Sequence, residues 1–479
     1  MRKLLAIIFV LCSVVAFAQQ NEDNSADTTF IVISKIDLQG NKRTRPSVIY
    51  RELLFRVGDT IFLEDNVADL MENVRIKQSR ENLLNTSLFN FVDFVWADFS
   101  DVEHGKSLTI IMLERWYMWH VPYLAYADRN LRSWFEANDW TRLSYGVDII
   151  YNNLWGLKHQ LDLTIIGGYN QKYAVSYDIP YLTDKQRLGI KASTGFTRDR
   201  EFPYITKDDK IDYFDDVDGD FAHLSYFASV TPYYRFGYRN RLFLTLKYDN
   251  RLFNDSLASL NSDFANDDGN RFQYFTLSAV FKNDYRDDHN YPLSGHYLEL
   301  ELTKIGLGMF DYAPDIFYGK LTADVYTPLI GRFYWASNVT TKIADSKTAP
   351  YFLSQGFGYN NDYVRSYDLY VVDALNYAIF KNNLKFEILK PVTKHLPIIK
   401  NERFSKIHLA FYANLFFDFA YTWDVVIPEG FSTRIANEWI YGTGIGIDFV
   451  TYYDKVLRLE YGINGLGESG FFVHLVAPI

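Results

Sequence analysis

The acidic run YFDDVDGDF, residues 213–221, is the stretch whose residue types could hold a metal ion. Clustered carboxylates supply the oxygen ligands that Ca²⁺ prefers. When Gly219 is aligned with the turn glycine of an EF-hand loop, Phe214 takes the first ligand position and Ser225 the last, so that motif fails. Two interpretations stay open: a surface site that bridges calcium or lipopolysaccharide, and a solvated loop.

Other enzyme motifs are absent from the sequence. It contains no G-x-S-x-G, no H-E-x-x-H and no phosphate-binding glycine loop, and its nine His residues are scattered without ligand spacing. We therefore predict that the protein is not an enzyme and uses no cofactor or metal. The net charge of −10 argues against nucleic acid as a partner, because like charges repel.

The N-terminus has the pattern of an export signal. Arg2 and Lys3 precede an apolar stretch that ends in Ala16-Phe17-Ala18, which predicts a signal peptide over residues 1–18 and a flexible lead over residues 19–29. Lipidation of Cys12 is the alternative, but the bulky Leu11 disfavours it. Cleavage would leave a chain without cysteine, in which neither disulfides nor thiolate metal sites can form.

The composition predicts a membrane protein that crosses with strands. The chain has 37 Tyr and 38 Phe, a mean hydropathy of −0.16, and no run of eighteen apolar residues after the signal, which excludes transmembrane helices. In lipid only helices and closed barrels satisfy every backbone group. Aromatic girdles are typical of such barrels, so we expect an all-β transmembrane barrel over residues 116–479.

Alternation with a period of two runs through this region. In residues 408–423 the odd positions are apolar, whereas Asn414, Asp418 and Thr422 occupy the even positions, as expected for one lipid face and one lumen face. The long polar gaps all follow odd-numbered strands, so we place them on one side of the membrane and tight turns such as Gly237-Tyr238 on the other. We predict about sixteen antiparallel strands that begin near residues 117, 142, 159, 172, 187, 223, 240, 272, 296, 318, 333, 376, 406, 440, 455 and 470.

Residues 30–115 have a different pattern, that of one small α+β domain. A strand with Ile31, Ile33 and Ile36 precedes a helix that opens at Pro46. A second helical stretch with Val67, Leu70, Met71, Val74, Leu83 and Leu84 and two strands, 91–99 and 108–115, complete the expected order of strand, helix, helix, strand, strand.

This domain resembles a POTRA domain, the periplasmic module of the outer-membrane assembly and translocation superfamily of BamA and TamA type. The resemblance rests on IDLQGNKRT, on the pair Gly58-Asp59, on LLNTSLF before the strand FVDFV, and on LTIIMLERW. With the motifs below it spans nearly the whole chain after the signal. It implies one POTRA domain in the periplasm and a sixteen-stranded barrel in the outer membrane.

The resemblance also implies a pair of residues inside the barrel. Val364-Arg365-Ser366-Tyr367 is similar to the VRG(F/Y) motif of the sixth extracellular loop, whose arginine meets an F-x-D aspartate in strand thirteen; here that residue is Asp418. The alternation independently points Asp418 to the lumen. Ser366 replaces the usual Gly, so we expect a different backbone conformation or a looser turn. The alternative is a solvated loop arginine with an unrelated carboxylate.

Two further stretches resemble the superfamily. The segment 283–295, NDYRDDHNYPLSG, matches its D-x-R-D…P…G turn, and we expect Asp and Arg contacts to local backbone to shape the barrel there. Near the C-terminus, small residues are expected to permit close backbone approach. The matching positions are Asp284, Arg286, Asp287, Pro292 and Gly295 in the turn, and Gly444, Gly446, Arg458, Glu460 and Gly462 near the end.

The resemblance implies an assembly factor that receives unfolded clients at its POTRA domain and inserts or translocates them through the barrel. Its partners would be unfolded outer-membrane β-barrel proteins or a secreted polypeptide, outer-membrane lipids and accessory lipoproteins. Two alternatives stay open: a two-partner-type secretion translocator and a non-transporting accessory barrel. The final Pro478-Ile479 in place of an aromatic leaves the closure between last and first strands open.

Overall fold

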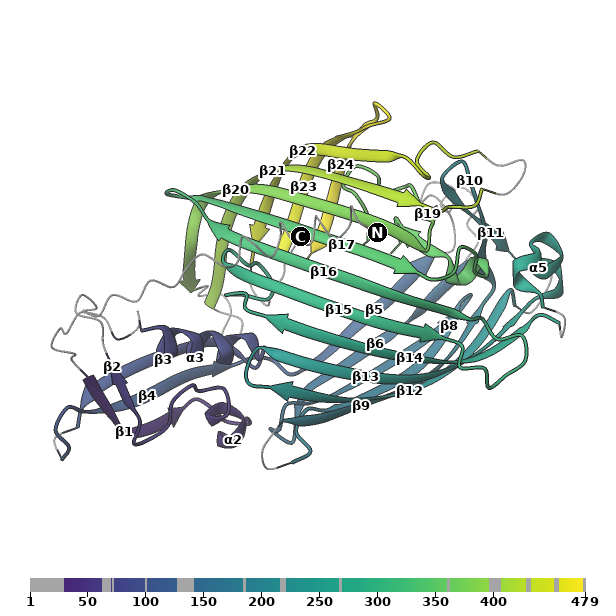
Figure 1. The fold of residues 1–479 in the computed structure, drawn as a ribbon. Helices are drawn as coiled ribbons and strands as arrows, with labels where there is room; N and C mark the ends of the chain where they lie inside the picture. The colour runs from purple at the N-terminus through teal and green to yellow at the C-terminus, as the bar shows by residue number, and fades with distance from the viewer. Residues whose placement is uncertain are drawn as a thin grey trace.

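The computed structural model describes most of the chain after the N-terminal segment (Figure 1). The predicted signal peptide and lead, residues 1–29, lie outside the described residues. The described ranges are 30–62, 70, 73–99, 101–126, 142–183, 187–215, 221–266, 269–359, 362–395, 406–427, 432–451 and 456–476.

A small α+β unit comes first in the chain and lies at one end of the molecule in Figure 1. Its four-stranded sheet has the order β2-β1-β4-β3, in which only the β1 and β4 pair is parallel. Ile33, Ile49 and Leu83 are fully buried between this sheet and two helices. The elements are β1 (Phe30–Gln39), α2 (Pro46–Tyr50), β2 (Thr60–Phe62), α3 (Val74–Asn85), β3 (Phe89–Asp98) and β4 (Gly105–Glu114).

Two features of this unit differ from the expected order. The sequence analysis missed β2, because a strand of three residues is too short for its alternation to stand out. The described helix α3 begins at Val74, and Asn73 caps it by accepting a hydrogen bond from the Arg75 backbone N–H at 3.1 Å; the predicted start near Val67 lies outside the described residues. Residues 63–69 lie outside the described ranges, and the assignment of the unit as a POTRA domain stays a prediction.

The rest of the described chain forms one sixteen-stranded sheet, rolled into a barrel in Figure 1. Every neighbouring pair is antiparallel, and each strand begins within two residues of its predicted start, so the prediction of sixteen strands is confirmed. The strands are β5 (Met118–Tyr126), β6 (Leu143–Leu154), β7 (His159–Gly168), β8 (Gln171–Ile179), β9 (Leu188–Asp199), β12 (His223–Phe236), β13 (Asn240–Phe253), β14 (Arg271–Asp284), β15 (Gly295–Ile305), β16 (Ile316–Pro328), β17 (Phe333–Ala344), β20 (Asn376–His395), β21 (Lys406–Trp423), β22 (Trp439–Val450), β23 (Val456–Asn464) and β24 (Ser469–Val476).

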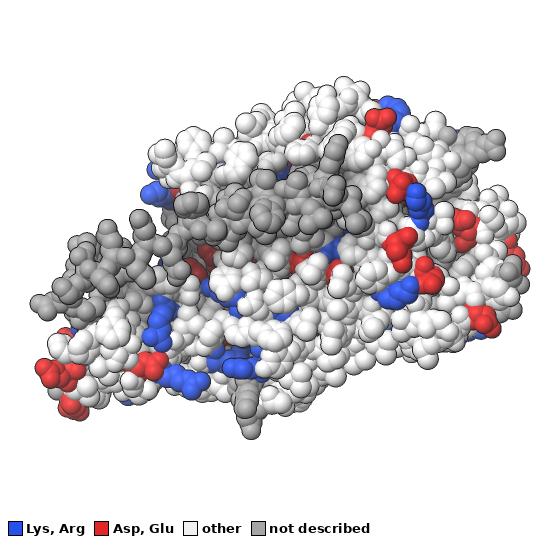
Figure 2. All heavy atoms as spheres, viewed as in Figure 1, with Lys and Arg blue, Asp and Glu red and all other residues white. Residues whose placement is uncertain are grey.

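The two faces of the sheet differ in polarity, as the alternation predicts. On β21 the apolar Leu415 and Phe417 are about half exposed on the outer face, whereas Asn414, Asp418 and Thr422 are buried on the inner face. The outer wall along β9, β12 and β13 is almost free of charge, and Lys and Arg gather where the small unit meets the barrel (Figure 2). An exposed apolar surface that spans several strands is typical of a protein that contacts a membrane or another protein.

The connections at the two ends of the barrel differ in length. Tight turns on the side of the small unit use Gly237 and Gly331 at φ 66° and 70°, a region that favours glycine. The long connections gather at the opposite end (Figure 1). There the chain forms short elements that the sequence did not predict: the hairpin β10 (Glu201–Lys207) with β11 (Lys210–Asp215), α5 (Asp255–Leu260), the 3₁₀ turns η3 (Ser262–Phe264) and η4 (Tyr351–Leu353), and the pair β18 (Gln355–Phe357) with β19 (Val372–Asp373).

Candidate functional site

The loop between β17 and β20 folds back into the barrel. Val364 and Tyr367 are almost completely buried and pack with Ile379, Ala420 and Ile440 on the inner faces of β20, β21 and β22. The Tyr367 hydroxyl accepts a hydrogen bond from the Gly465 backbone N–H at 3.0 Å, just after β23. The loop therefore contacts β20, β21 and β22, and the connection between β23 and β24.

Arg365 and Asp418 meet at the centre of this contact. The Arg365 Nε and Nη2 atoms donate to the two Asp418 carboxylate oxygens at 2.7 and 2.5 Å, and its backbone N–H donates to the same carboxylate at 3.3 Å. Both side chains are inaccessible, with 4% and 0% of their surface exposed. A bidentate pair of this kind fixes the direction as well as the distance of the two groups.

Other lumen residues complete the surroundings of Arg365. Its Nη1 donates to Asn383 Oδ1 at 2.7 Å and to Glu460 Oε1 at 3.4 Å, and its guanidinium lies 4.2 Å from the centre of the Phe416 ring. Glu460 was predicted as part of the C-terminal strand motif but not as a partner of Arg365, and Asn383 was not predicted. The missed signal was the polar series Lys381, Asn383, Lys385 and Glu387, whose spacing of two marks the inner face of β20.

A second buried ion pair lies beside the first. Arg458 donates from Nε and Nη2 to the Asp448 carboxylate at 2.7 and 3.0 Å, and its Nε is 3.8 Å from Glu460. Glu460 thus lies between the guanidinium groups of Arg365 and Arg458. Two arginines and three carboxylates form one network, which we call the latch: Arg365, Asp418, Asp448, Arg458 and Glu460.

Glycines let the loop approach the strands. A Cβ atom on Gly442 would lie 2.0 Å from the Arg365 carbonyl oxygen, and one on Gly462 would lie 2.0 Å from Ser366 Oγ. A Cβ atom on Gly444 would lie 2.3 Å from the Tyr461 carbonyl oxygen, and one on Gly446 would lie 2.8 Å from the Glu460 side chain. Ser366, where the superfamily usually has Gly, has a φ of 73°, in the left-handed region that favours glycine.

The D-x-R-D turn lies at the other end of the barrel, between β14 and β15. Asp284 accepts from Arg286 Nε and Nη2 at 2.8 and 2.7 Å, and Asp287 Oδ1 accepts from the Leu293 and Ser294 backbone N–H groups. Gly295 has a φ of 99°, and a Cβ there would meet the Tyr285 carbonyl oxygen at 2.1 Å. Pro292 lies within the loop of this turn. Aspartate and arginine thus organise the local backbone, as expected.

This turn also reaches the latch, which the sequence did not indicate. The buried Tyr291 donates from its hydroxyl to Asp448 at 2.8 Å, and its ring lies 4.7 Å from that of Tyr412. The aromatic residue next to Pro292 therefore joins the turn to the charged network inside the barrel.

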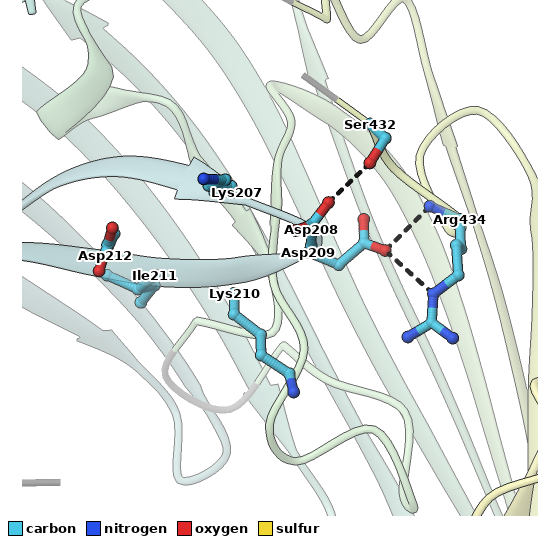
Figure 3. A pocket seen from close by; sticks show the side chains of 8 residues that line it. All are labelled: Lys207, Asp208, Asp209, Lys210, Ile211, Asp212, Ser432 and Arg434. Carbon is cyan, nitrogen blue, oxygen red and sulfur yellow. Dashed lines mark hydrogen bonds and ion pairs between the residues drawn. The ribbon is translucent and has the colours of Figure 1, made fainter. Parts of the chain in front are cut away.

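The hairpin β10–β11 joins the loops at the far end (Figure 3). Its two-residue tip, Asp208-Asp209, has φ angles of 50° and 63°, which a tight hairpin requires. Asp208 accepts from Ser432 at 2.6 Å, and the buried Asp209 accepts from Thr433 and from the Arg434 backbone at 2.9 Å. The tip borders a cavity of about 450 Å³ that includes Lys207, Lys210 and Arg434. The hairpin tip therefore joins two loops that are more than two hundred residues apart in the chain.

The small unit docks on the opposite end of the barrel through charged residues. Glu52 accepts from Arg235 Nη1 and Nη2 at 3.1 and 2.7 Å and from Arg51 at 2.5 Å. Arg51 lies over the Tyr181 ring at 3.3 Å. Burial raises the pKa of Glu52, but the attraction of Arg235 and Arg51 outweighs it and leaves that pKa well below its ordinary value. The carboxylate therefore stays charged at neutral pH.

Metal ligands and membrane-spanning helices are the other features considered for the described residues. Among the described residues no group of three or more His, Cys, Asp or Glu side chains is arranged to bind a metal. Residues 216–220 of the acidic run lie outside the described ranges, so the calcium interpretation is not tested there. In the described part of the chain no helix is both long and apolar enough to cross a membrane.

No protein-family model matches the chain, and no curated protein does. Solved structures are similar to it, among them the following three. BamA from Haemophilus ducreyi lacking POTRA domains 1–3 has 14% identity and a TM-score of 0.46 over 93% of this chain and 83% of that one. CdiB from Acinetobacter baumannii has 14% identity and a TM-score of 0.44, over 93% and 74% of the two chains. CdiB from Escherichia coli has 10% identity and a TM-score of 0.48, over 96% and 92%.

Proposed function

We propose that the chain is an outer-membrane barrel that inserts β-barrel proteins into the membrane, with the small unit acting as a periplasmic POTRA domain. The observation that carries the proposal is the loop held inside the barrel by Arg365, Asp418 and Glu460. A general diffusion pore needs a water-filled lumen. Here an ordered loop with paired charges occupies the lumen beside β20 to β23.

The exposed apolar wall supports the membrane location. Leu244, Leu300 and Ile445 lie on three different strands and are 47%, 43% and 61% exposed. Lipid tails satisfy such a surface, and the unbroken series of hydrogen-bonded strands from β5 to β24 satisfies the backbone groups between them.

The small unit supports a role in receiving polypeptides. Its edge strand β2 is short, and Phe62, the last residue of this strand, is 63% exposed. An unfolded chain can add to such an edge through main-chain hydrogen bonds, which makes recognition tolerant of sequence. The client would then pass to the barrel strands.

Depletion of the protein in its host, followed by quantitative proteomics of the outer-membrane fraction, tests the proposal. We expect many barrel proteins to fall together, and we expect Arg365→Ala to fail to restore them. Lys347→Ala is the matched control, because Lys347 belongs to the same loop and its side chain is 73% exposed.

Two other outcomes would refute the assembly function. Loss of one exported protein from the medium with an unchanged barrel proteome would favour a secretion translocator. No change in either fraction, with loss of a multiprotein complex on native gels, would favour an accessory barrel.

A further inference from the structure

Two adjoining cavities lie where the small unit covers the mouth of the barrel. Their volumes are about 290 and 70 Å³. Four residues line both cavities, and three of them are cations: Thr86, Lys158, Arg235 and Arg241. Figure 2 shows Lys and Arg side chains gathered at this junction. We call the two spaces together the junction cavity.

Some of the cations that line the junction cavity are paired with carboxylates, and others are not. Arg235 pairs with Glu52 at 2.7 Å, Arg239 with Glu81 at 3.6 Å, and Lys282 with Glu299 at 2.8 Å. Within the part of the chain that the structure describes, the side chains of Lys158 and Arg241 form no ion pair and no hydrogen bond. Arg235 Nε is also buried without a hydrogen-bond partner.

The neighbouring carboxylates are already occupied. Asp178 accepts from the Tyr233 hydroxyl at 2.7 Å, and Glu52 is shared by Arg51 and Arg235. Arg241 points into the lumen, because its neighbours in the alternation, Leu244 and Leu246, are exposed on the outer face. Lys158 and Arg241 therefore face the cavity without an ion pair of their own, and the carboxylates of Asp178 and Glu52 line the same space.

The state of Lys158 shows the cost of this arrangement. Burial lowers the pKa of Lys158 to about 7; Glu52 opposes that change and the charge of Arg241 adds to it. Lys158 and Arg241 are half-buried, so an anion between them would gain charge-assisted hydrogen bonds in a space that is partly screened from water.

We propose that the junction cavity binds an oxyanion, a carboxylate or a phosphate group, between Lys158 and Arg241. The arginine supplies a planar fork that matches two oxygens, and the lysine supplies a point charge. The volume exceeds that of a single oxyanion, so the bound group can belong to a longer molecule. The acidic end of a polypeptide and free phosphate share this chemistry. The site does not depend on whether the barrel moves polypeptides.

Isothermal titration calorimetry on the full chain in detergent tests the site. The probes are inorganic phosphate and a pair of short peptides that differ only in a C-terminal carboxylate or amide. We expect saturable binding of phosphate or of the carboxylate peptide, weakened at least tenfold by Arg241→Gln and by Lys158→Gln. Arg241→Lys should lose less. Lys282→Gln is the matched control, because Lys282 borders the same cavity but has its own carboxylate.

A variant-free measurement accompanies the titration in case the variants fold poorly. Phosphate should protect Arg241 from phenylglyoxal, as followed by mass spectrometry, with Arg434 as the exposed reference. Binding of the carboxylate peptide but not phosphate would identify a polypeptide ligand, and the reverse a free anion. The proposal is overturned if neither probe binds, or if both variants bind as the parent does with no protection of Arg241.

Discussion

The latch inside the barrel and the junction between the small unit and the barrel both join segments that are far apart in the chain. They differ in how completely their cations are paired with carboxylates. In the latch each guanidinium meets carboxylates at short range, and Asp418 and Asp448 have no exposed surface. At the junction the Glu52 pair is equally short, yet Lys158 and Arg241 face open space. A matched, closed network holds one arrangement, whereas an unmatched one leaves room for a ligand or for separation.

The largest effect should come from removing one side of the latch. Asp418→Ala leaves Arg365 buried without its main counter-charge and should lower the free energy of unfolding by about 3–5 kcal/mol. The unfolding temperature in detergent measures this change. Asp315→Ala, just before β16 with its side chain 78% exposed, is the control and should change little. Equal effects of the two variants would mean that the latch does not hold the loop.

A substitution at the junction should have a smaller effect. It should change the orientation of the small unit on the barrel rather than the unfolding of the protein. Glu52→Gln removes the carboxylate shared by Arg51 and Arg235, and should weaken docking of the small unit by about 3 kcal/mol. Because the chain has a single cysteine, within the predicted signal peptide, spin labels can be placed at the exposed Val57 and Ile330. Pulsed electron paramagnetic resonance should then show a broader distance distribution. Glu103→Gln, at an exposed position of the same unit, is the control.

Acid should produce the same change in the parent protein. The folded pKa of Glu52 is depressed, so its contribution is complete above the ordinary glutamate pKa of about 4.3 and is lost progressively as the pH falls from there toward the lowered folded pKa. The distance distribution should therefore broaden below that pH and stay constant from pH 5 to 8. Broadening in the neutral range would contradict the assignment of docking to Glu52.

The sequence predicts the features that depend on neighbouring residues, but not those that join distant parts of the chain. Strand starts and the lumen direction of Asp418 follow from alternation, which is a local property. Glu52–Arg235 and Tyr291–Asp448 join residues more than 150 positions apart, and no local pattern pairs them. The β10–β11 hairpin was missed because an acidic, polar gap gives no periodic signal.

A smaller perturbation of the latch acts through shape alone. A methyl group on Gly442 would meet the Arg365 carbonyl oxygen, which is backbone and cannot rotate away, so Gly442→Ala should destabilise the folded loop by about 2 kcal/mol. Gly319→Ala is the control, since its nearest neighbour would be Leu302 at 3.5 Å, an ordinary contact. Protease cleavage within the loop should rise only for the first variant. Unchanged cleavage would show that the loop does not rest on β22.

The smallest effect should be a gain. Ser366 holds a left-handed φ of 73°, and its hydroxyl is buried without a hydrogen-bond partner. Ser366→Gly removes both costs at the expense of a more flexible unfolded chain, so we expect a stabilisation of about 1 kcal/mol. The same change should rescue part of Gly462→Ala, because the added methyl group would otherwise lie 2.0 Å from Ser366 Oγ. A double-mutant cycle on the unfolding free energy should give a coupling of about 1 kcal/mol, whereas additive effects would place the loop away from β23.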